Sequence, residues 1–454
     1  MANGFVRVPP DSTGKRLFTQ QHTVDGSDVQ IQVMHVSDHM QPGNFQAIDV
    51  QGAASVRFSE GQPLMAGFGS LKVSNQRALG VYESSLADNP DFATEITGGG
   101  SSTYSSQTSS HILAADTANG SKVYRTTDRY HYYMPGTSNL VMMTVACGDA
   151  GKANNKRCWG LFDGGDGVFF VLNGTTMSVA VRSSVSGSVV STLIPQAQWN
   201  VDKLDGTGLS GFTLDVTKIN VWWIDFQWLG AGRVRFGVYG ADGQRITCHI
   251  VENANANALP FMRTGTLPVR FEVENAGATG SSSELRVVCA AVYAEGNFDD
   301  YTFYRYSTGL LTKNVSAPQT LLLALRALAT VNGKHNSIQT YPETLNVYTT
   351  QPIGITLFQD VPDFTGGTWA ATGYQSLLER NTDGSFTYQQ SKPMKTFFFN
   401  TGCTTVDLSE FFEVNDRGIM VNADGTQQVW AMLCSPLTAS AADVTLNLSY
   451  KELW

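Results

Sequence analysis

The chain has few charged residues and no long hydrophobic run. Of its 454 residues, 15% are Asp, Glu, Lys or Arg, against about 25% in an ordinary soluble domain. Small polar residues and 44 glycines take the place of the missing charges. Because Lys, Glu and Ala favour helices while Thr, Val and aromatic residues favour strands, this composition argues against a helical enzyme and predicts an all-β protein.

Further absences narrow the classes of partner. No segment approaches the roughly 18 consecutive apolar residues of a membrane-spanning helix. The first residues, MANGFVRVPPDSTGKRLF, lack the apolar core of a signal peptide. The net charge of −9 repels phosphate, which argues against binding to nucleic acid. We therefore expect no membrane partner, no nucleic-acid partner and folding in a reducing cytoplasm.

The six cysteines are widely spaced along the chain. They show no CxxC spacing, so a zinc site is not expected. Their even number leaves disulfides open, but thiols stay reduced in a cytosolic environment. We expect reduced, mostly buried thiols at Cys147, Cys158, Cys248, Cys289, Cys403 and Cys434.

The pattern of strands and turns divides the chain into three regions. Residues 1–80 predict an extended arm or a small β-domain for docking, although a plain first strand pair of the main domain is the alternative. Residues 81–298 carry short strands separated by glycine turns, which is typical of a β-sandwich. Residues 299–454 predict a second sandwich. The fold class is therefore all-β, with two sandwich or jelly-roll-like units behind the N-terminal region.

One hairpin in residues 221–238 shows the strand alternation most clearly. Its first strand places Trp222 and Phe226 on one face and Trp223 and Asp225 on the other. The strand after the GAG turn brings Arg235 onto the polar face. A cross-strand pair between Arg235 and Asp225 would stabilise this hairpin.

Three segments are harder to assign. Residues 95–122 are rich in Gly, Ser and Thr, which predicts a loop inside one domain. Residues 320–331 have the Leu and Ala content of a helix, but their β context favours a strand. Residues 407–415 are compatible with one helical turn that Asp407 would cap.

Carboxylate pairs are the first candidates for chemistry. A glycosidase needs two carboxyl groups at a fixed separation across a sugar. Every pair here lies in a polar or Gly-rich turn, where Asp commonly bonds its own backbone, so we expect turn formation rather than catalysis. DGGDG could also bind calcium, although it lacks the pattern of a twelve-residue calcium loop. The pairs are Asp163 with Asp166, Asp202 with Asp205, and Asp299 with Asp300.

Other side chains give no stronger signal. The seven histidines lack metal-ligand spacing, and His35 and His39 would share a face only on a helix. No serine-hydrolase elbow or phosphate loop is present. Trp223 has three interpretations: packing inside the chain, which we favour, a protein interface, or a platform for sugar. We predict no catalytic, cofactor or metal residue and no enzyme activity.

Four long segments of the chain carry specific sequence motifs in a fixed order. They are GFGSLKVSNQRAL (67–79), KRCWGLFDGGDGVFFVLNGTTMSVAVRSSVSGSVV (156–190), QAQWNVDKLDGTGLSGFTLDVTKINVWWIDFQWLGAGRVRFGV (196–238) and FMRTGTLPVRFEVEN (261–275). These segments resemble a family of structural proteins of tailed bacteriophages, including marine and cyanobacterial ones. That family carries, in order, elements of the form GxLxVSN, GxFDxxxGVFF, WNxDKLDGTGxSGxTLD, WLGxGRVRFG and MRTxxLPVR. The resemblance covers about residues 67 to 275 of this chain.

The resemblance implies a non-enzymatic component of a virion: a tail, baseplate, collar or fibre-type protein, or a capsid decoration protein. Such a protein assembles in the host cytoplasm, docks on other virion proteins and forms a homo-oligomer, with a trimer favoured by analogy. The alternative is a receptor-binding module that recognises a host surface glycan. A polysaccharide-degrading enzyme is disfavoured because no repeat period is visible.

The resemblance also implies structural roles for the residues of its motifs. The glycines would shape turns, the tryptophans would anchor a core, and the arginines would lie on polar strand faces near acidic groups. These residues are Gly206, Gly208, Gly230 and Gly232; Trp199 and Trp228; and Arg233, Arg235 and Arg270.

Overall fold

The structure is a computed structural model of the chain. It describes residues 76–295, 303–373, 375–388, 392–409 and 418–453, together with three N-terminal strands. The chain forms two compact units, Met1–Glu60 and Gly61–Trp454. Among the described residues, no helix is long and apolar enough to cross a membrane.

The first unit contains a small antiparallel sheet. Its strands are paired in the order β1–β2–β3. The sequence predicted a strand at residues 29–36, of which 29–32 lie in β3 and the rest lies outside the described residues. The strands are β1 (Asn3–Arg7), β2 (Arg16–Val24) and β3 (Ser27–Gln32).

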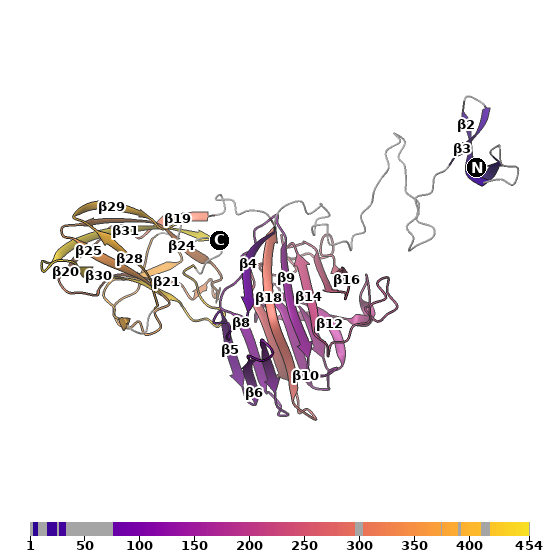
Figure 1. Cartoon of the computed structure of the whole chain (residues 1–454), viewed down its shortest axis with the longest axis horizontal. Helices are drawn as coiled ribbons and strands as arrows, with labels where there is room; N and C mark the ends of the chain where they lie inside the picture. Colours follow the sequence, from indigo (N-terminus) through magenta and orange to yellow (C-terminus); the bar gives the residue numbers. More distant parts are fainter. Residues whose placement is uncertain are drawn as a thin grey trace. The chain divides into compact units, whose positions relative to one another are not determined.

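The first sandwich of the second unit has a seven-stranded and an eight-stranded antiparallel sheet (Figure 1). The seven-stranded sheet has the order β13-β12-β11-β10-β17-β8-β5. Its strands are β5 (Phe92–Thr97), β8 (Lys122–Thr127), β10 (Asn155–Phe162), β11 (Gly167–Asn173), β12 (Thr176–Ser183), β13 (Val190–Pro195) and β17 (Val269–Asn275).

The eight-stranded sheet has the order β16-β15-β14-β9-β18-β7-β6, and β4 pairs with β18. Its strands are β4 (Gln76–Glu83), β6 (Gly100–Ser105), β7 (Ser110–Ala115), β9 (Asn139–Cys147), β14 (Asn220–Phe226), β15 (Val234–Tyr239), β16 (Arg245–Val251) and β18 (Ser283–Glu295). A 3-10 turn, η1 (Gln196–Gln198), follows β13 of the other sheet.

The second sandwich lies in residues 303–453. One sheet has the order β19-β31-β24-β29 with β20 on β31, the other has the order β26-β27-β21-β30-β25-β28, and β22 and β23 form a separate hairpin. The strands are β19 (Phe303–Ser307), β20 (Leu311–Val315), β21 (Thr320–Ala327), β22 (Thr330–Val331), β23 (Lys334–His335), β24 (Gln339–Thr349), β25 (Ile353–Gln359), β26 (Ala370–Ala371), β27 (Leu378–Asn381), β28 (Lys392–Phe399), β29 (Gly402–Asp407), β30 (Val429–Pro436) and β31 (Ala442–Leu453).

The core of the first sandwich is aromatic. The rings of Trp159 and Trp222 meet edge to face at 4.9 Å, and Phe170 lies 4.8 Å from Trp222. Strands alternate their side chains between two faces, yet β10 also buries Phe162 on the face turned away from this core. The guanidinium of Arg182 lies 5.3 Å from that ring. The apolar run CWGLF that ends β10 is therefore explained by burial on both faces of the strand.

The all-β sandwich prediction is confirmed, and so is the predicted hairpin. β14 and β15 pair with Asp225 directly opposite Arg235, and the two side chains form a buried ion pair of 2.8 Å. The turn between β11 and β12 is a tight hairpin after Asn173, in which Gly174 has a φ of 61°. All six cysteines are free, and only Cys289 and Cys403 are exposed.

The loop prediction for residues 95–122 is wrong. This segment contributes the end of β5 and the whole of β6 and β7. The three glycines make a tight turn, in which Gly98 has a φ of 58°, and the following Ser and Thr residues form a solvent-facing edge strand.

The strand prediction at residues 320–331 is confirmed by β21. The helical turn expected at 407–415 falls largely outside the described residues.

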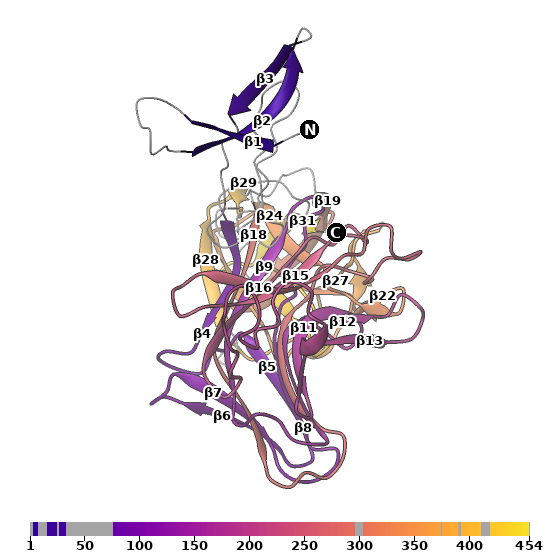
Figure 2. The same cartoon turned by 90° about the vertical axis from the view of Figure 1, so that its right-hand side faces the viewer.

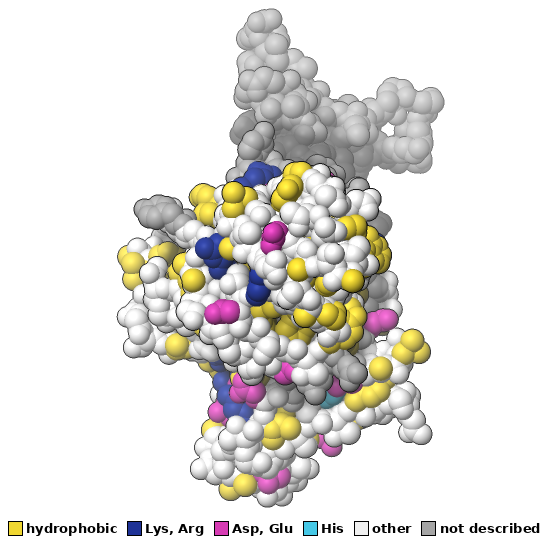
Figure 3. Space-filling view, turned by 90° about the vertical axis from the view of Figure 1, so that its left-hand side faces the viewer, with side chains coloured by type: hydrophobic (Ala, Val, Ile, Leu, Met, Phe, Trp, Pro, Cys, Tyr) yellow, Lys and Arg dark blue, Asp and Glu magenta, His cyan; other side chains and the backbone are white. Residues whose placement is uncertain are grey.

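The surface reflects the low charge of the sequence. On the face of the molecule shown in Figure 3, charged side chains are sparse and hydrophobic ones are scattered among uncharged polar atoms. The second sandwich contributes exposed Phe398 and Leu437, which lie near each other over Gly354.

Candidate functional site

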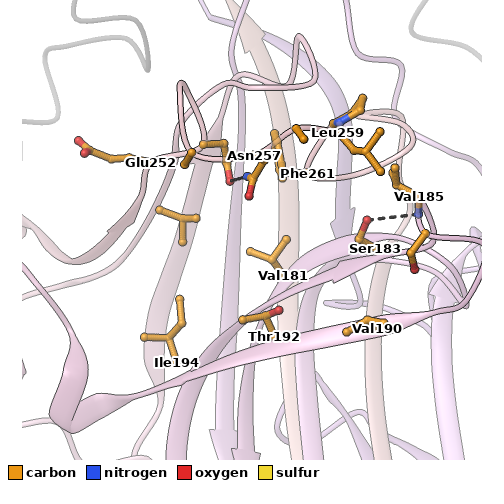
Figure 4. Close-up of a pocket in the computed structure, with 16 residues that line it drawn as sticks. Val181, Ser183, Val185, Val190, Thr192, Ile194, Glu252, Asn257, Leu259 and Phe261 are labelled. Atoms are coloured by element: carbon orange, nitrogen blue, oxygen red, sulfur yellow. Dashed lines mark hydrogen bonds between the residues drawn. The ribbon is translucent and has the colours of Figure 1, made fainter.

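A slot opens at one edge of the first sandwich, between its two sheets. Strands β12 and β13 end the seven-stranded sheet, and β16 ends the eight-stranded sheet; Figure 2 shows β11, β12 and β13 side by side. The loop 252–261, which follows β16, faces β12 and β13 across a hollow of about 610 Å³ (Figure 4). The slot thus lies where the inner face of one sheet extends beyond the cover of the other.

The floor of the slot is mainly aliphatic, with Ser183 and Thr192 as its polar members. Val181 of β12 pairs in register with Thr192 of β13, so both project from the same face of the sheet. Figure 4 shows Val181, Thr192 and Ile194 pointing into the hollow. Val181 and Ile194 also pack against the main core, whereas Val190 at the end of the floor is 53% exposed.

The opposite wall is the loop 252–261, which is held by hydrogen bonds. Buried Asn253 donates from Nδ2 to the carbonyl of Gly232 at 2.7 Å, and Asn257 donates to Asn253 Oδ1 at 3.3 Å. The amide of Phe261 donates to the Gly230 carbonyl at 2.9 Å. The anchored loop leaves its apolar side chain Leu259 60% exposed.

The slot combines an apolar centre with a few polar groups. Glu252, Asn257, Ser183 and Thr192 line it together with Val, Ala, Leu, Ile, Pro and Phe side chains. Its volume lies within the roughly 300–1,000 Å³ of small-molecule sites, which are mostly apolar with a few convergent polar groups. This arrangement suits a small ligand that is apolar on one part and hydroxylated on another.

A second hollow of about 460 Å³ lies where the two sandwiches of the second unit meet. Gln339 donates to the carbonyl of Tyr130 at 2.6 Å, and the rings of Tyr130 and His335 stack at 4.7 Å. Burial and then the Asp163 carboxylate raise the pKa of Tyr130, and burial lowers the pKa of His335. The stacked rings and hydrogen bond fix this junction.

The carboxylates of DGGDG are occupied by protein donors at this junction. Asp163 Oδ1 accepts from the amides of Gly165 and Asp166 at 2.7 and 2.8 Å, and its Oδ2 accepts from Tyr130. Asp166 is fully buried and accepts from Ser184 and from the Arg263 amide. These contacts are the expected turn chemistry.

The other carboxylate pairs behave in the same way where they are described. Asp202 Oδ1 and Oδ2 accept from the amides of Leu204 and Ser210 at 2.8 and 2.9 Å, and Asp205 accepts from Thr207. Asp299, Asp300, His35 and His39 lie outside the described residues. Within the part of the chain that is described, no group of three His, Cys, Asp or Glu side chains could hold a metal ion.

Trp223 is a packed residue, as the favoured interpretation predicted. Its side chain is 1% exposed and its indole N–H donates to the Val238 carbonyl at 3.2 Å. The guanidinium of Arg245 covers the ring at 5.0 Å from its centre. The indole face is therefore unavailable as a platform for sugar.

The motif residues of the phage resemblance serve the scaffold. A Cβ on Gly208 would lie 2.1 Å from a carboxylate oxygen of Asp202, so only glycine fits the loop that Asp202 organises. Trp199 is buried in the core, and the indole of Trp228 donates to the Met262 carbonyl. The three arginines meet acidic partners as expected: Arg233 with Glu252, Arg235 with Asp225, and Arg270 with Glu272.

None of the residues of the slot was identified from the sequence. The strands and the loop that form it are separated by about 60 residues, so no local motif joins them. The loop sequence ENANANALPF alternates Asn with Ala before Leu-Pro-Phe, but Asn, Ala and Pro are depleted in strands, so it gave only a loop signal.

No protein-family model matches the chain, and no curated protein matches its sequence. Among solved structures, it is similar to a legume lectin-like domain from Entamoeba histolytica, with 11% identity, 49% of this chain and 99% of that chain covered, and a TM-score of 0.29.

Two further solved structures show the same level of similarity. A lectin from Bauhinia forficata in complex with GalNAc has 10% identity, covers 49% of this chain and 99% of its own, and gives a TM-score of 0.29. A protein of unknown function from Shewanella oneidensis has 10% identity, 49% and 88% coverage and a TM-score of 0.31.

Proposed function

We propose that the protein is a non-enzymatic binding protein whose first sandwich holds a carbohydrate in the slot between β12, β13 and the loop 252–261. The observation that carries the proposal is the slot itself: an open hollow with an aliphatic floor and a rim of carboxylate, amide and hydroxyl groups. Sugars match this combination because they present C–H faces beside hydroxyl groups that donate and accept hydrogen bonds.

The polar rim is positioned to recognise hydroxyl groups. Asn257 uses one of its two N–H groups on Asn253, which leaves donor and acceptor capacity at the mouth of the slot. Thr192 and Ser183 add hydroxyls along the floor. These groups are held by a paired strand and an anchored loop, so little side-chain and loop ordering is needed on binding.

The acidic groups of the slot favour binding without hydrolysis. A glycosidase places two carboxyl groups on either side of the scissile bond. Among the described residues that line the slot, Glu252 is the one acidic side chain, and it lies 3.5 Å from Arg233. A single carboxylate can accept hydrogen bonds from a sugar but provides no acid–base pair.

The test is a glycan array with the purified full chain and two matched variants. Thr192→Trp places a large ring in the slot from an exposed strand position, and we expect it to weaken binding at least tenfold. Leu193→Trp puts the same ring on the same strand but on the opposite face, where it should leave binding unchanged. If no glycan binds the folded full chain, or if both variants bind like the parent, the proposal is wrong.

A second candidate function is a structural role in a phage particle, with the glycan site as part of the adsorption apparatus. The motif residues that carry the resemblance support the sandwich itself, as the contacts of Asp202, Trp228 and Arg235 illustrate. Mass spectrometry of particles, with copy counting, tests this role. Many copies would indicate capsid decoration, few would indicate a tail part, and absence from particles would exclude it.

A further inference from the structure

The slot has no aromatic platform. A sugar ring is often held by stacking on an exposed aromatic face, where the apolar area of the ring supplies much of the contact. The one aromatic residue in the described lining is Phe261, which is 7% exposed and packs into the core. The accessible walls are aliphatic instead and include Val181, Val190, Ile194 and Leu259.

Aliphatic walls favour a different part of a sugar from the one that aromatic rings favour. A sugar hydroxyl group that packs against these aliphatic side chains loses its hydrogen bonds to water without replacement, which opposes binding. A methyl group loses nothing and gains the benefit of apolar burial. The centre of the slot is therefore complementary to a methyl group, while Asn257 and Glu252 at the rim are complementary to the hydroxyls around it.

We propose that the slot selects saccharides that carry a methyl group, a 6-deoxyhexose or an N-acetyl sugar, over the corresponding parent hexoses. This inference rests on the proposed function and names the ligand class of that site. Burial of one methyl group is worth about fourfold in affinity, the equivalent of about 0.8 kcal/mol. The two sources of the methyl group share this chemistry and are separated by the choice of probes.

The experiment measures monosaccharide binding to the full chain by saturation-transfer NMR and competition. L-fucose is compared with L-galactose and L-rhamnose with L-mannose, because each pair differs only in replacement of the C6 hydroxyl by hydrogen. N-acetylglucosamine is compared with glucose in the third arm. We expect a preference of about fourfold or more for the methyl-bearing member of at least one pair. Its methyl protons should receive the strongest saturation.

Two near-isosteric variants tie the preference to the slot. Val190→Thr replaces an exposed methyl group of the floor by a hydroxyl. It should bring the affinities for the methyl-bearing sugar and its parent hexose closer to equality. Val189→Thr makes the same change at a neighbouring residue that is 54% exposed and does not line the slot, so the preference should persist. Both positions are on the surface, so both variants should fold.

The outcomes separate this inference from the proposed function. If sugars bind in the slot but the parent hexoses bind as tightly as their methyl-bearing counterparts, the selectivity proposal is overturned and carbohydrate binding stands. An unchanged preference in Val190→Thr also overturns it. If no glycan on the array and no monosaccharide binds, the proposed function fails and takes this inference with it.

Discussion

His131 should make the first sandwich sensitive to acid. Its ring is 2% exposed; Nδ1 lies 3.0 Å from the Leu267 carbonyl and Nε2 lies 2.8 Å from the Tyr82 hydroxyl. Because a carbonyl only accepts, Nδ1 carries the proton and Nε2 accepts from Tyr82. Tyr82 in turn accepts from Arg129 Nε at 3.1 Å. The neutral imidazole is thus fully satisfied, and a second proton would place a charge in a buried site beside a guanidinium.

The size of the effect follows from the pKa of His131. Burial, and then the neighbouring Arg129, lower this pKa to about 3, while the Leu267 carbonyl opposes the shift. An unfolded chain binds this proton near pH 6.5, so between pH 6.5 and about 3 unfolding takes up a proton. The contribution of neutral His131 to the free energy of unfolding is therefore fully present above pH 6.5. It falls by about 1.4 kcal/mol for each pH unit below that. At pH 4.5 the loss is about 3 kcal/mol.

Urea unfolding of the wild type and of His131→Gln at pH 7.0 and 4.5 measures how much His131 contributes to the loss of stability in acid. Glutamine does not titrate, so the carboxylates that also respond to acid contribute equally to both proteins. We expect the wild type to lose about 3 kcal/mol more than the variant over this interval. Equal losses in the two proteins would refute the assignment of a neutral, buried His131.

Two further predictions concern the scaffold. Gly208→Ala should lower the free energy of unfolding by about 2 kcal/mol or more, because its Cβ would meet the Asp202 carboxylate at 2.1 Å; Gly164→Ala, which meets no atom within 4 Å, should be neutral in the same urea titration. In the native protein, a thiol reagent should modify only the exposed Cys289 and Cys403, and denaturant should release the remaining thiols. Rapid labelling of a third cysteine would contradict the burial.

The strands of the first sandwich were predictable where alternation was strong. The hairpin of β14 and β15 places Asp225 opposite Arg235 as expected, because a period of two fixes both the faces and the register. The sequence favoured packing for Trp223 but did not indicate which residue covers it; on the polar face it is buried as completely as Trp222 on the apolar face. The guanidinium of Arg245 covers it, a contact made by a strand beyond the hairpin.

The strands β6 and β7 were missed for a related reason. A segment rich in Gly, Ser and Thr has the composition typical of a loop, and the loop prediction for residues 95–122 depended on composition alone. In the structure, Thr103 pairs with Ile112, and β7 in turn pairs with β18, with Ile112 opposite Arg286. The neighbouring strand therefore supplies the partner that stabilises a segment of weak intrinsic preference.

The slot could not be predicted because it is a property of how two sheet edges end. Each lining strand has an ordinary alternating sequence, and Val181 and Ile194 would be core residues if the eight-stranded sheet had one more strand beyond β16. The loop 252–261 takes the place of that strand and leaves a hollow instead of a packed layer. The proposed binding site therefore lies at an uncovered edge of the core, which is why the exposed position Thr192 and not the buried Trp223 is the position to mutate.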